Sequence, residues 1–224
     1  MSLIVKICGL STPDTIDAAA NAGADMVGFM FFERSPRAVT IEQAVALRRH
    51  LAGRAESVAV TVDMDDADLA AIVDAVEPDW LQLHSRESVE RVAEIRERFP
   101  QKVMKAVGIR DHADLTKASA YADVADALLL DAKPPKDADR PGGLGVAFDW
   151  TILDGFAPTV PWMLSGGLDP DNVAEAIRMT GAPGVDVSSG VETAPGRKDA
   201  TLIRRFVAAA RDAAGAADAE RLAS

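Results

Sequence analysis

Residues 5–23 read VKICGLSTPDTIDAAANAG, a short apolar run followed by a tight turn and a longer amphipathic segment. Ser11 and Thr12 precede Pro13, a combination that favours the start of a helix. Gly23 stands where a helix commonly ends in a left-handed residue. The stretch therefore predicts a strand followed by a helix, and the same pattern recurs along the chain.

This alternation predicts a single α/β domain. Strands are expected near residues 3–8, 26–31, 57–63, 79–84, 102–107, 125–131, 159–164 and 184–188, and helices near 12–22, 40–52, 66–76, 86–98, 112–121, 148–154, 171–180 and 198–213. Such a repeat over 224 residues is typical of a closed parallel barrel, so we predict one (β/α)8 TIM barrel over residues 1–224. The Ala-rich residues 212–224 are expected to be a frayed helix end. An open doubly wound sheet usually carries Gly-x-Gly-x-x-Gly after its first strand, where this chain has Cys8-Gly9-Leu10-Ser11.

Composition narrows the class of protein. A hydrophobic content of 48% with 26% charged residues supplies a sizeable core. The formal net charge of -11, without a basic run, argues against nucleic-acid or anionic-membrane partners. One cysteine excludes an internal disulfide, and with three histidines it leaves little material for a soft-metal cage. Lys6 interrupts the first apolar run early, and no stretch is long enough to span a membrane, so we expect a cytoplasmic protein.

Polar residues interrupt several predicted strands near their C-terminal ends. Each pair is two residues apart, and the pairs are Lys6 and Cys8, Thr61 and Asp63, Gln82 and His84, and Asp186 and Ser188; Asp131 also ends a strand. Side chains two apart point the same way on a strand, so these groups are expected to meet at the barrel mouth, where active sites of this fold lie. A structural ion-pair network, for example Lys6 with Asp131 or Asp186, is the alternative interpretation.

Two glycine-containing stretches indicate an anion site. LSGGLDPDN at 164–172 follows the seventh predicted strand, and VDVSSGV at 185–191 contains the eighth. Loops at these positions commonly bind phosphate in such barrels. The first half of the chain has no counterpart of this pattern, so a single phosphate group is expected. The long segment 132–147 lacks periodicity and is expected to be functional or mobile.

The chain resembles the phosphoribosylanthranilate isomerase family. The motifs that carry the resemblance are VKICGL at 5–10, GADMVGFMFFERSPRAVT at 23–40, LQLHSRES at 81–88, LLLDA at 128–132, GGLGVAFDW at 142–150, LSGGLDPDNVAEAI at 164–177 and VDVSSGVE at 185–192. The resemblance implies a (β/α)8 barrel of tryptophan biosynthesis. It also implies conversion of N-(5-phosphoribosyl)anthranilate to 1-(2-carboxyphenylamino)-1-deoxyribulose 5-phosphate without cofactor or metal.

The resemblance also implies roles for individual residues. The family's general base falls on Cys8, its general acid on Asp131, and its anthranilate-holding arginine on Arg37. The other implied residues are Gly166, Gly167, Ser188, Ser189 and Gly190 for the phosphate, and Asp186 lining the pocket, to which we add Lys6 and His84 as substrate-binding residues. Ser85 and Asp63 depart from the residues common in the family, and neither is a catalytic position. The expected partner is the small phosphosugar–anthranilate substrate, and the expected state is a monomer or homodimer.

The implied reaction is an Amadori rearrangement, which needs an acid and a base. Asp131 must be protonated to act as the acid, and apolar surroundings with a nearby carboxylate such as Asp186 would favour that form. Cys8 must be a thiolate to act as the base. We therefore expect Lys6 to stand two residues away because a buried cation favours the thiolate.

Three alternatives remain at this point. The histidine-pathway aminoimidazole carboxamide ribotide isomerase performs the same rearrangement on a two-phosphate substrate, but its family begins the first strand with an aspartate base. Ribulose-phosphate epimerases use metal-binding His and Asp residues that this chain lacks. A catalytically inactive barrel that serves as a binding subunit would bind the reduced product without turnover.

Overall fold

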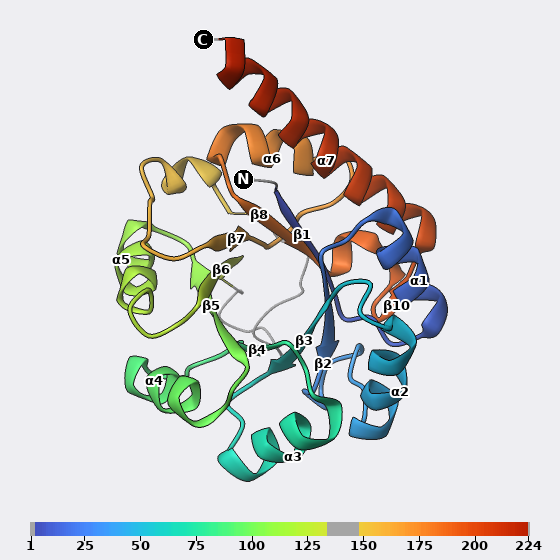
Figure 1. The fold of residues 1–224 in the computed structure, drawn as a ribbon. Coiled ribbons are helices and arrows are strands. Elements are labelled where there is room, and N and C mark those ends of the chain that lie inside the picture. Colours follow the sequence, from blue (N-terminus) through green and yellow to red (C-terminus); the bar gives the residue numbers. More distant parts are fainter. Residues whose placement is uncertain (1–2, 134–147, 224) are drawn as a thin grey trace.

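The structure is a computed structural model that describes residues 3–133 and 148–223, with side chains up to residue 216. Eight parallel strands of this described part are β1 Ile4–Cys8, β2 Met26–Met30, β3 Glu56–Thr61, β4 Trp80–Leu83, β5 Lys102–Ile109, β6 Ala127–Ala132, β7 Trp162–Leu164 and β8 Gly184–Val187. Each pairs with the next, and β8 pairs with β1, so the sheet closes into a barrel (Figure 1). The closed ring confirms the predicted fold and excludes the open sheet.

The α-helices of the described residues surround this barrel (Figure 1). They are α1 Pro13–Ala22, α2 Ile41–Leu51, α3 Asp66–Val76, α4 Val89–Arg98, α5 His112–Ala120, α6 Val173–Thr180 and α7 Ala200–Ala223. Thr12 caps α1 by accepting the N–H of Thr15, and Gly23 ends it at φ 90°, as the sequence predicts. The side chains of Thr40 and Gln43 form a reciprocal capping box at the start of α2.

The structure corrects the sequence predictions between β6 and the C-terminus. The helix expected at 148–154 is a short 3-10 helix, η1 Trp150–Leu153. Asp169 accepts the N–H groups of Asp171 and Asn172, so it closes a turn before α6 and does not cap a longer helix. The last helix continues beyond residue 213 to Ala223, and its final turns extend past the barrel in Figure 1. Fraying of 212–224 stays a prediction, and the predicted loop 132–147 lies mostly outside the described residues.

A short hairpin was not predicted. After β8, the 3-10 helix η2 Ser189–Val191 leads into β9 Glu192–Ala194, which pairs antiparallel with β10 Arg197–Lys198. The hairpin precedes α7 and follows the glycine-containing stretch that ends β8. It therefore adds side chains next to the predicted phosphate site that the barrel repeat alone does not supply.

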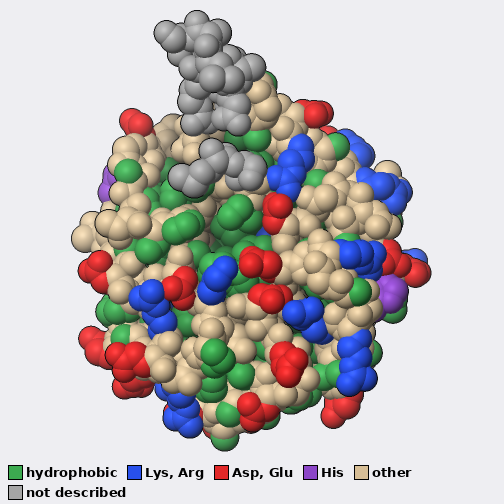
Figure 2. All heavy atoms as spheres, in the orientation of Figure 1, with side chains coloured by type: hydrophobic (Ala, Val, Ile, Leu, Met, Phe, Trp, Pro, Cys, Tyr) green, Lys and Arg blue, Asp and Glu red, His purple; other side chains and the backbone are tan. Residues whose placement is uncertain are grey.

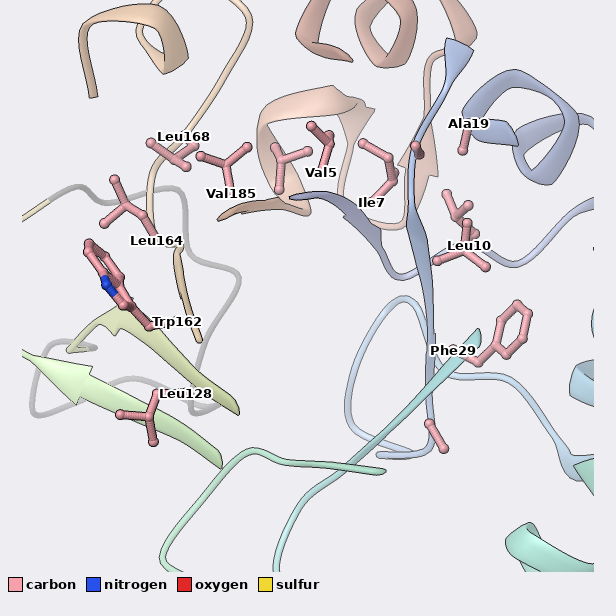
Figure 3. Packing of buried hydrophobic residues seen from close by; sticks show 14 of the residues in the cluster. Val5, Ile7, Leu10, Ala19, Phe29, Leu128, Trp162, Leu164, Leu168 and Val185 are labelled. Atoms are coloured by element: carbon pink, nitrogen blue, oxygen red, sulfur yellow. The ribbon is translucent and has the colours of Figure 1, made fainter. Parts of the chain in front are cut away.

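Apolar side chains form two layers, one on each side of the strands. The inner layer fills the barrel, and its members are Cys8, Met26, Val58, Val60, Trp80, Met104, Ala106, Ala127, Leu129 and Met163. The outer layer joins the strands to the helices, and Figure 3 shows part of it, with Val5 of β1 beside Val185 of β8. Because both faces of the strands are covered, their sequences are nearly continuous apolar runs.

On the face drawn in Figure 2, acidic and basic side chains are interspersed among apolar ones. Within the described residues, none of the helices combines the length and the hydropathy needed to span a membrane.

Candidate active site

The inner face of the barrel brings most of the predicted site residues to one end. Cys8 belongs to the inner apolar layer, and so do Leu129 of β6 and Trp80 of β4. Alternation along each strand then places Asp131 and His84 on the same inner face, at the ends where the strands finish. Lys6 and Asp186 face each other across the β1–β8 pair. The predicted convergence at the mouth is thus confirmed for these strands.

The pair Thr61 and Asp63 does not share this orientation. Val58 and Val60 of β3 belong to the inner layer, so Thr61 points to the outer side, where its hydroxyl donates to the carbonyl of Gln82. Asp63 lies beyond the strand at φ 45° and accepts hydrogen bonds from the Ser85 hydroxyl and the Arg86 N–H. The prediction that these two line the mouth as a pair is wrong, because apolar residues occupy both faces of β3 and its sequence does not reveal which face is inner.

Lys6 forms a fully buried ion pair. Its Nζ lies 2.8 Å from Oδ1 of Asp186, whose Oδ2 accepts a hydrogen bond of 3.2 Å from the Ser165 hydroxyl. Burial disfavours the charged ammonium, but Asp186 and Cys8 outweigh it, and the pKa of Lys6 lies above its ordinary value. Of the two ion-pair partners considered from the sequence, the structure shows Asp186.

Cys8 lies beside this pair and is 6% exposed. Burial raises the pKa of the Cys8 thiol above its ordinary value, and the positive charge of Lys6 offsets this only in part. Lys6 therefore favours the thiolate, as expected from the sequence, but the effect of burial on the Cys8 thiol is larger. A Cβ atom at Gly28 would lie 3.0 Å from the Cys8 sulfur, so glycine on β2 leaves room beside the thiol.

The raised thiol pKa has a measurable consequence. Only the thiolate reacts rapidly with iodoacetamide, so the alkylation rate of the folded chain should rise at higher pH than that of an ordinary thiol. The chain has one cysteine, so mass spectrometry follows Cys8 alone. The same chain in concentrated urea is the control, and it should titrate at the ordinary value. Coinciding titrations of folded and unfolded chain would contradict the burial argument.

Asp131 is held by two contacts at the end of β6. Its Oδ1 accepts the N–H of Ala132 at 2.9 Å, and its Oδ2 lies 3.3 Å from Nε2 of His84. The Gln82 amide nitrogen lies 2.8 Å from Nδ1 of His84, an orientation that places the imidazole hydrogen on Nε2, facing Asp131. The Gln82 Oε1 is buried without a partner among the described residues.

Arg37 lies in the loop between β2 and α2 and is 4% exposed. Its Nε and Nη2 donate to the two carboxylate oxygens of Glu192 at 2.7 and 2.8 Å. A Cβ atom at Gly9 would lie 2.6 Å from Cδ of Arg37, so the arginine packs directly against the turn that follows Cys8. The structure therefore places Arg37 next to β1, in a geometry that Glu192 fixes.

The two glycine-containing loops pack against each other. Gly166 and Gly167 have φ values of 87° and 66°, which favour glycine. A Cβ atom at Gly166 would lie 2.4 Å from the N of Ala132, and one at Gly190 would lie 1.9 Å from the carbonyl oxygen of Leu168. Close packing of the backbone thus requires both glycines. It joins the end of β6 and the loops after β7 and β8, where Ser188 and Ser189 also lie.

Three further polar residues near the site were not assigned from the sequence. Glu192 and Lys198 belong to the hairpin β9–β10, and Gln82 was noted only for its orientation on β4. The SSGVE segment, with a lysine six residues after the glutamate, was the available signal, but nothing in the spacing indicates that both turn back toward Arg37. Among the described residues, no three Cys, His, Asp or Glu side chains are grouped as metal ligands.

Comparisons with known proteins agree with this geometry. The sequence model of N-(5'-phosphoribosyl)anthranilate (PRA) isomerase matches residues 5–209. A relative called N-(5'-phosphoribosyl)anthranilate isomerase, from Rhodopseudomonas palustris strain HaA2, is 60% identical over 211 residues, which cover 94% of this chain and 97% of the relative.

Solved structures give the same result. A phosphoribosyl anthranilate isomerase in complex with reduced 1-(o-carboxyphenylamino)-1-deoxyribulose 5-phosphate is 33% identical with a TM-score of 0.80, over 94% of this chain and 99% of that chain. A structure of monomers derived from the dimeric enzyme of Thermotoga maritima is 34% identical with a TM-score of 0.79, over the same shares. Both the family match and the 60% identity span most of the sequence, and the chain therefore belongs to the N-(5'-phosphoribosyl)anthranilate isomerase family.

Proposed function

We propose that Cys8 and Asp131 are the base and the acid of the isomerisation that this family performs. The activity itself follows from the family, and it is the rearrangement of N-(5'-phosphoribosyl)anthranilate in tryptophan biosynthesis. One observation carries the assignment of the two roles. The side chains of Cys8 and Asp131 lie on the inner face of a closed barrel, near the C-terminal ends of β1 and β6. The glycine-containing loops lie at the same end of the barrel.

In the proposed mechanism, Asp131 acts first. Its carboxyl proton passes to the ring oxygen of the ribose, and the bond between that oxygen and C1 breaks. The anilino nitrogen supplies the electron pair, so an iminium ion forms and Asp131 is left as a carboxylate. Cys8, in its thiolate form, then removes the proton from C2, which gives an enolamine and a neutral thiol. Addition of a proton at C1 and loss of the proton on the enol oxygen yield the ketone.

His84 and Gln82 suit both protonation states of Asp131. With the amide oriented as described, the Nε2–H of His84 donates to the Asp131 carboxylate. If the Gln82 amide turns over, its oxygen accepts from Nδ1–H, and Nε2 is then free to accept the proton of a neutral Asp131. In each orientation only one of the two amide atoms of Gln82 contacts Nδ1 of His84. The other is left over, as Oε1 is among the described residues. We therefore propose that His84 holds the acid in place through the proton transfer.

The remaining predicted residues are proposed to bind the two anionic ends of the substrate. Arg37 takes the anthranilate carboxylate, since a guanidinium matches a carboxylate in shape and charge. The phosphate is bound by backbone and hydroxyl groups in the two loops that pack together. These groups belong to Gly166, Gly167, Ser188, Ser189 and Gly190. Lys6 and Asp186 form a neutralised pair beside Cys8, and we assign both to the pocket wall that faces the sugar.

The test is the fluorescence of phosphoribosylanthranilate, generated in situ, in the presence of the purified chain. We expect rapid loss of the signal, and we expect the reduced product analogue bound by the related enzyme to inhibit it. Tight binding of the analogue without any loss of substrate would identify an inactive binding barrel and would contradict the proposed roles.

We further propose that the chain works in the cytoplasm, as a monomer or a homodimer. The cytoplasm suits a biosynthetic enzyme family. Among the described residues, Met179 is the one large hydrophobic side chain that is exposed. This favours the monomer, because stable dimer interfaces are apolar. A relative in Thermotoga maritima is described as dimeric. Light scattering at two protein concentrations distinguishes the two states.

A further inference from the structure

Three charged side chains form a buried network behind the barrel mouth. Glu192 of β9 accepts two hydrogen bonds from Arg37, at 2.7 and 2.8 Å, and its Oε1 also lies 2.8 Å from Nζ of Lys198 on β10. The three side chains are between 1% and 5% exposed. Glu192 contacts Arg37 and Lys198 in this network, so an effect of Glu192 on a bound ligand would pass through these neighbours.

Lys198 extends this network to the phosphate loop. Its Nζ donates to the carbonyl oxygen of Ser188 at 2.8 Å and contacts the Ser188 hydroxyl at 3.2 Å. That hydroxyl donates to the carbonyl oxygen of Cys8 at 3.3 Å. One set of contacts thus joins Arg37, Ser188 and the end of the strand that carries Cys8.

The hairpin that carries Glu192 and Lys198 is itself held against the Arg37 loop. A Cβ atom at Gly196 would lie 2.3 Å from the carbonyl oxygen of Pro36, and Gly196 has a φ of 79°. The N–H of Gly196 donates to Oε2 of Glu192 at 3.2 Å. Glycine at the tip of the hairpin therefore permits a contact that a larger residue would prevent, and the glutamate receives donors from both elements.

The charges of the network are compatible with this role. Burial opposes ionisation of Glu192, but hydrogen bonds from Arg37 and the charge of Lys198 outweigh it, so the pKa of Glu192 lies below its ordinary value. Burial lowers the pKa of Lys198, and Glu192 opposes this effect. A charged glutamate with several donors is a rigid anchor, because each oxygen is fixed by more than one contact.

We propose that Glu192 and Lys198 are positioning residues, Glu192 orienting the Arg37 guanidinium for the anthranilate carboxylate and Lys198 orienting Ser188 for the phosphate. The hairpin β9–β10 then sets the distance between the two anionic ends of the substrate. This inference rests on the proposed function, since it takes Arg37 and Ser188 as the substrate contacts.

The experiment measures the two ends of the substrate separately. Anthranilate binding is followed by its own fluorescence, and inorganic phosphate binding by phosphorus NMR, so neither readout needs catalysis. The variants are Glu192→Gln, which keeps the shape and removes the charge, and Lys198→Met, which keeps the length and removes the donors. Lys198→Arg is the conservative replacement, since it retains a cationic donor.

Glu192→Gln should weaken the binding of anthranilate by roughly 10- to 100-fold, the effect of losing a charged hydrogen bond. It should weaken the binding of phosphate less. Lys198→Met should weaken phosphate by a similar factor and anthranilate less, and Lys198→Arg should restore much of the phosphate affinity. In turnover, both variants should raise KM more than they lower kcat.

Asp126→Asn is the matched control. Asp126 accepts the N–H of Val103 at 2.8 Å and pairs with Arg96 at 2.7 Å, so it is also an arginine-bound carboxylate, but it precedes β6 at the opposite end of the barrel. Its removal should leave both binding constants unchanged. If Glu192→Gln and Lys198→Met weaken both probes equally, or weaken neither, positioning is overturned.

Failure of the proposed function would look different. Arg37→Ala and Ser188→Ala remove the assigned contacts themselves, and each should weaken its own probe at least as much as the hairpin variants do. If these two weaken their probes while the hairpin variants do not, the inference alone is overturned. If Arg37→Ala or Ser188→Ala has no effect, the assigned contact is wrong, and the inference is overturned together with it.

Discussion

Replacing Asp131 by Asn is expected to lower kcat/KM by about 10²–10⁴-fold, the usual contribution of a positioned acid. Asparagine can keep the contact with the Ala132 N–H through its amide oxygen. Its amide nitrogen then faces Nε2 of His84 and can donate to it in the other tautomer of the imidazole. Asparagine cannot deliver a proton to the ring oxygen. The geometry should therefore survive while the first step of the reaction fails.

Cys8→Ser should give a loss of similar size, about 10²–10⁴-fold, because a hydroxyl is a far weaker base than a thiolate at neutral pH. Serine fits the space that Gly28 leaves beside residue 8. The measurement is the decay of substrate fluorescence under identical conditions, with Asp126→Asn as the control. A loss below about tenfold in either variant would contradict the role proposed for that residue.

Replacing Lys6 by Met is expected to destabilise the fold by about 3–5 kcal/mol, the usual cost of removing one partner of a buried ion pair. Asp186 would remain 4% exposed, with the Ser165 hydroxyl as its remaining side-chain partner. Urea unfolding followed by circular dichroism gives the free energy. The double variant Lys6→Met with Asp186→Leu is the comparison, and it should recover much of the loss because no charge is left buried.

The same ion pair predicts a dependence of stability on pH. The pKa of Lys6 is raised in the folded chain, so its contribution is fully present below the unfolded value of about 10.4 and is lost as pH rises through the higher folded pKa. The difference in stability between the original chain and Lys6→Met should therefore be constant near neutral pH and should shrink in strong alkali. If the free energy of unfolding of Lys6→Met lies within about 1 kcal/mol of that of the original chain, the cost argued from the buried ion pair is contradicted.

The sequence predicted the barrel because its strand and helix periods alternate and its helices carry local signals. Thr12 and Thr40 cap helices through contacts three residues away, which a sequence displays directly. The family resemblance added the activity, which the comparisons support. The placement of Cys8, His84 and Asp131 on the inner face also followed from alternation along each strand.

What the sequence missed depends on long-range contacts. Glu192 and Arg37 are 155 residues apart, and no local pattern relates them. The orientation of Thr61 failed because β3 is apolar on both faces, so its sequence does not reveal which face is inner. The ionisation of Cys8 also depends on a balance between desolvation and the Lys6 charge, and composition or spacing does not contain that balance.

The pairing of β1 with β8 has a consequence for how the chain acquires activity. Lys6 and Asp186 are 180 residues apart, and so are Cys8 and Ser188. Contacts over such separations form late, because the intervening chain must first be ordered. A chain interrupted before β8 would leave the Lys6 ammonium facing inward without its carboxylate. Enzymatic turnover therefore reports that β1 has paired with β8, and it can serve as an assay for complete folding.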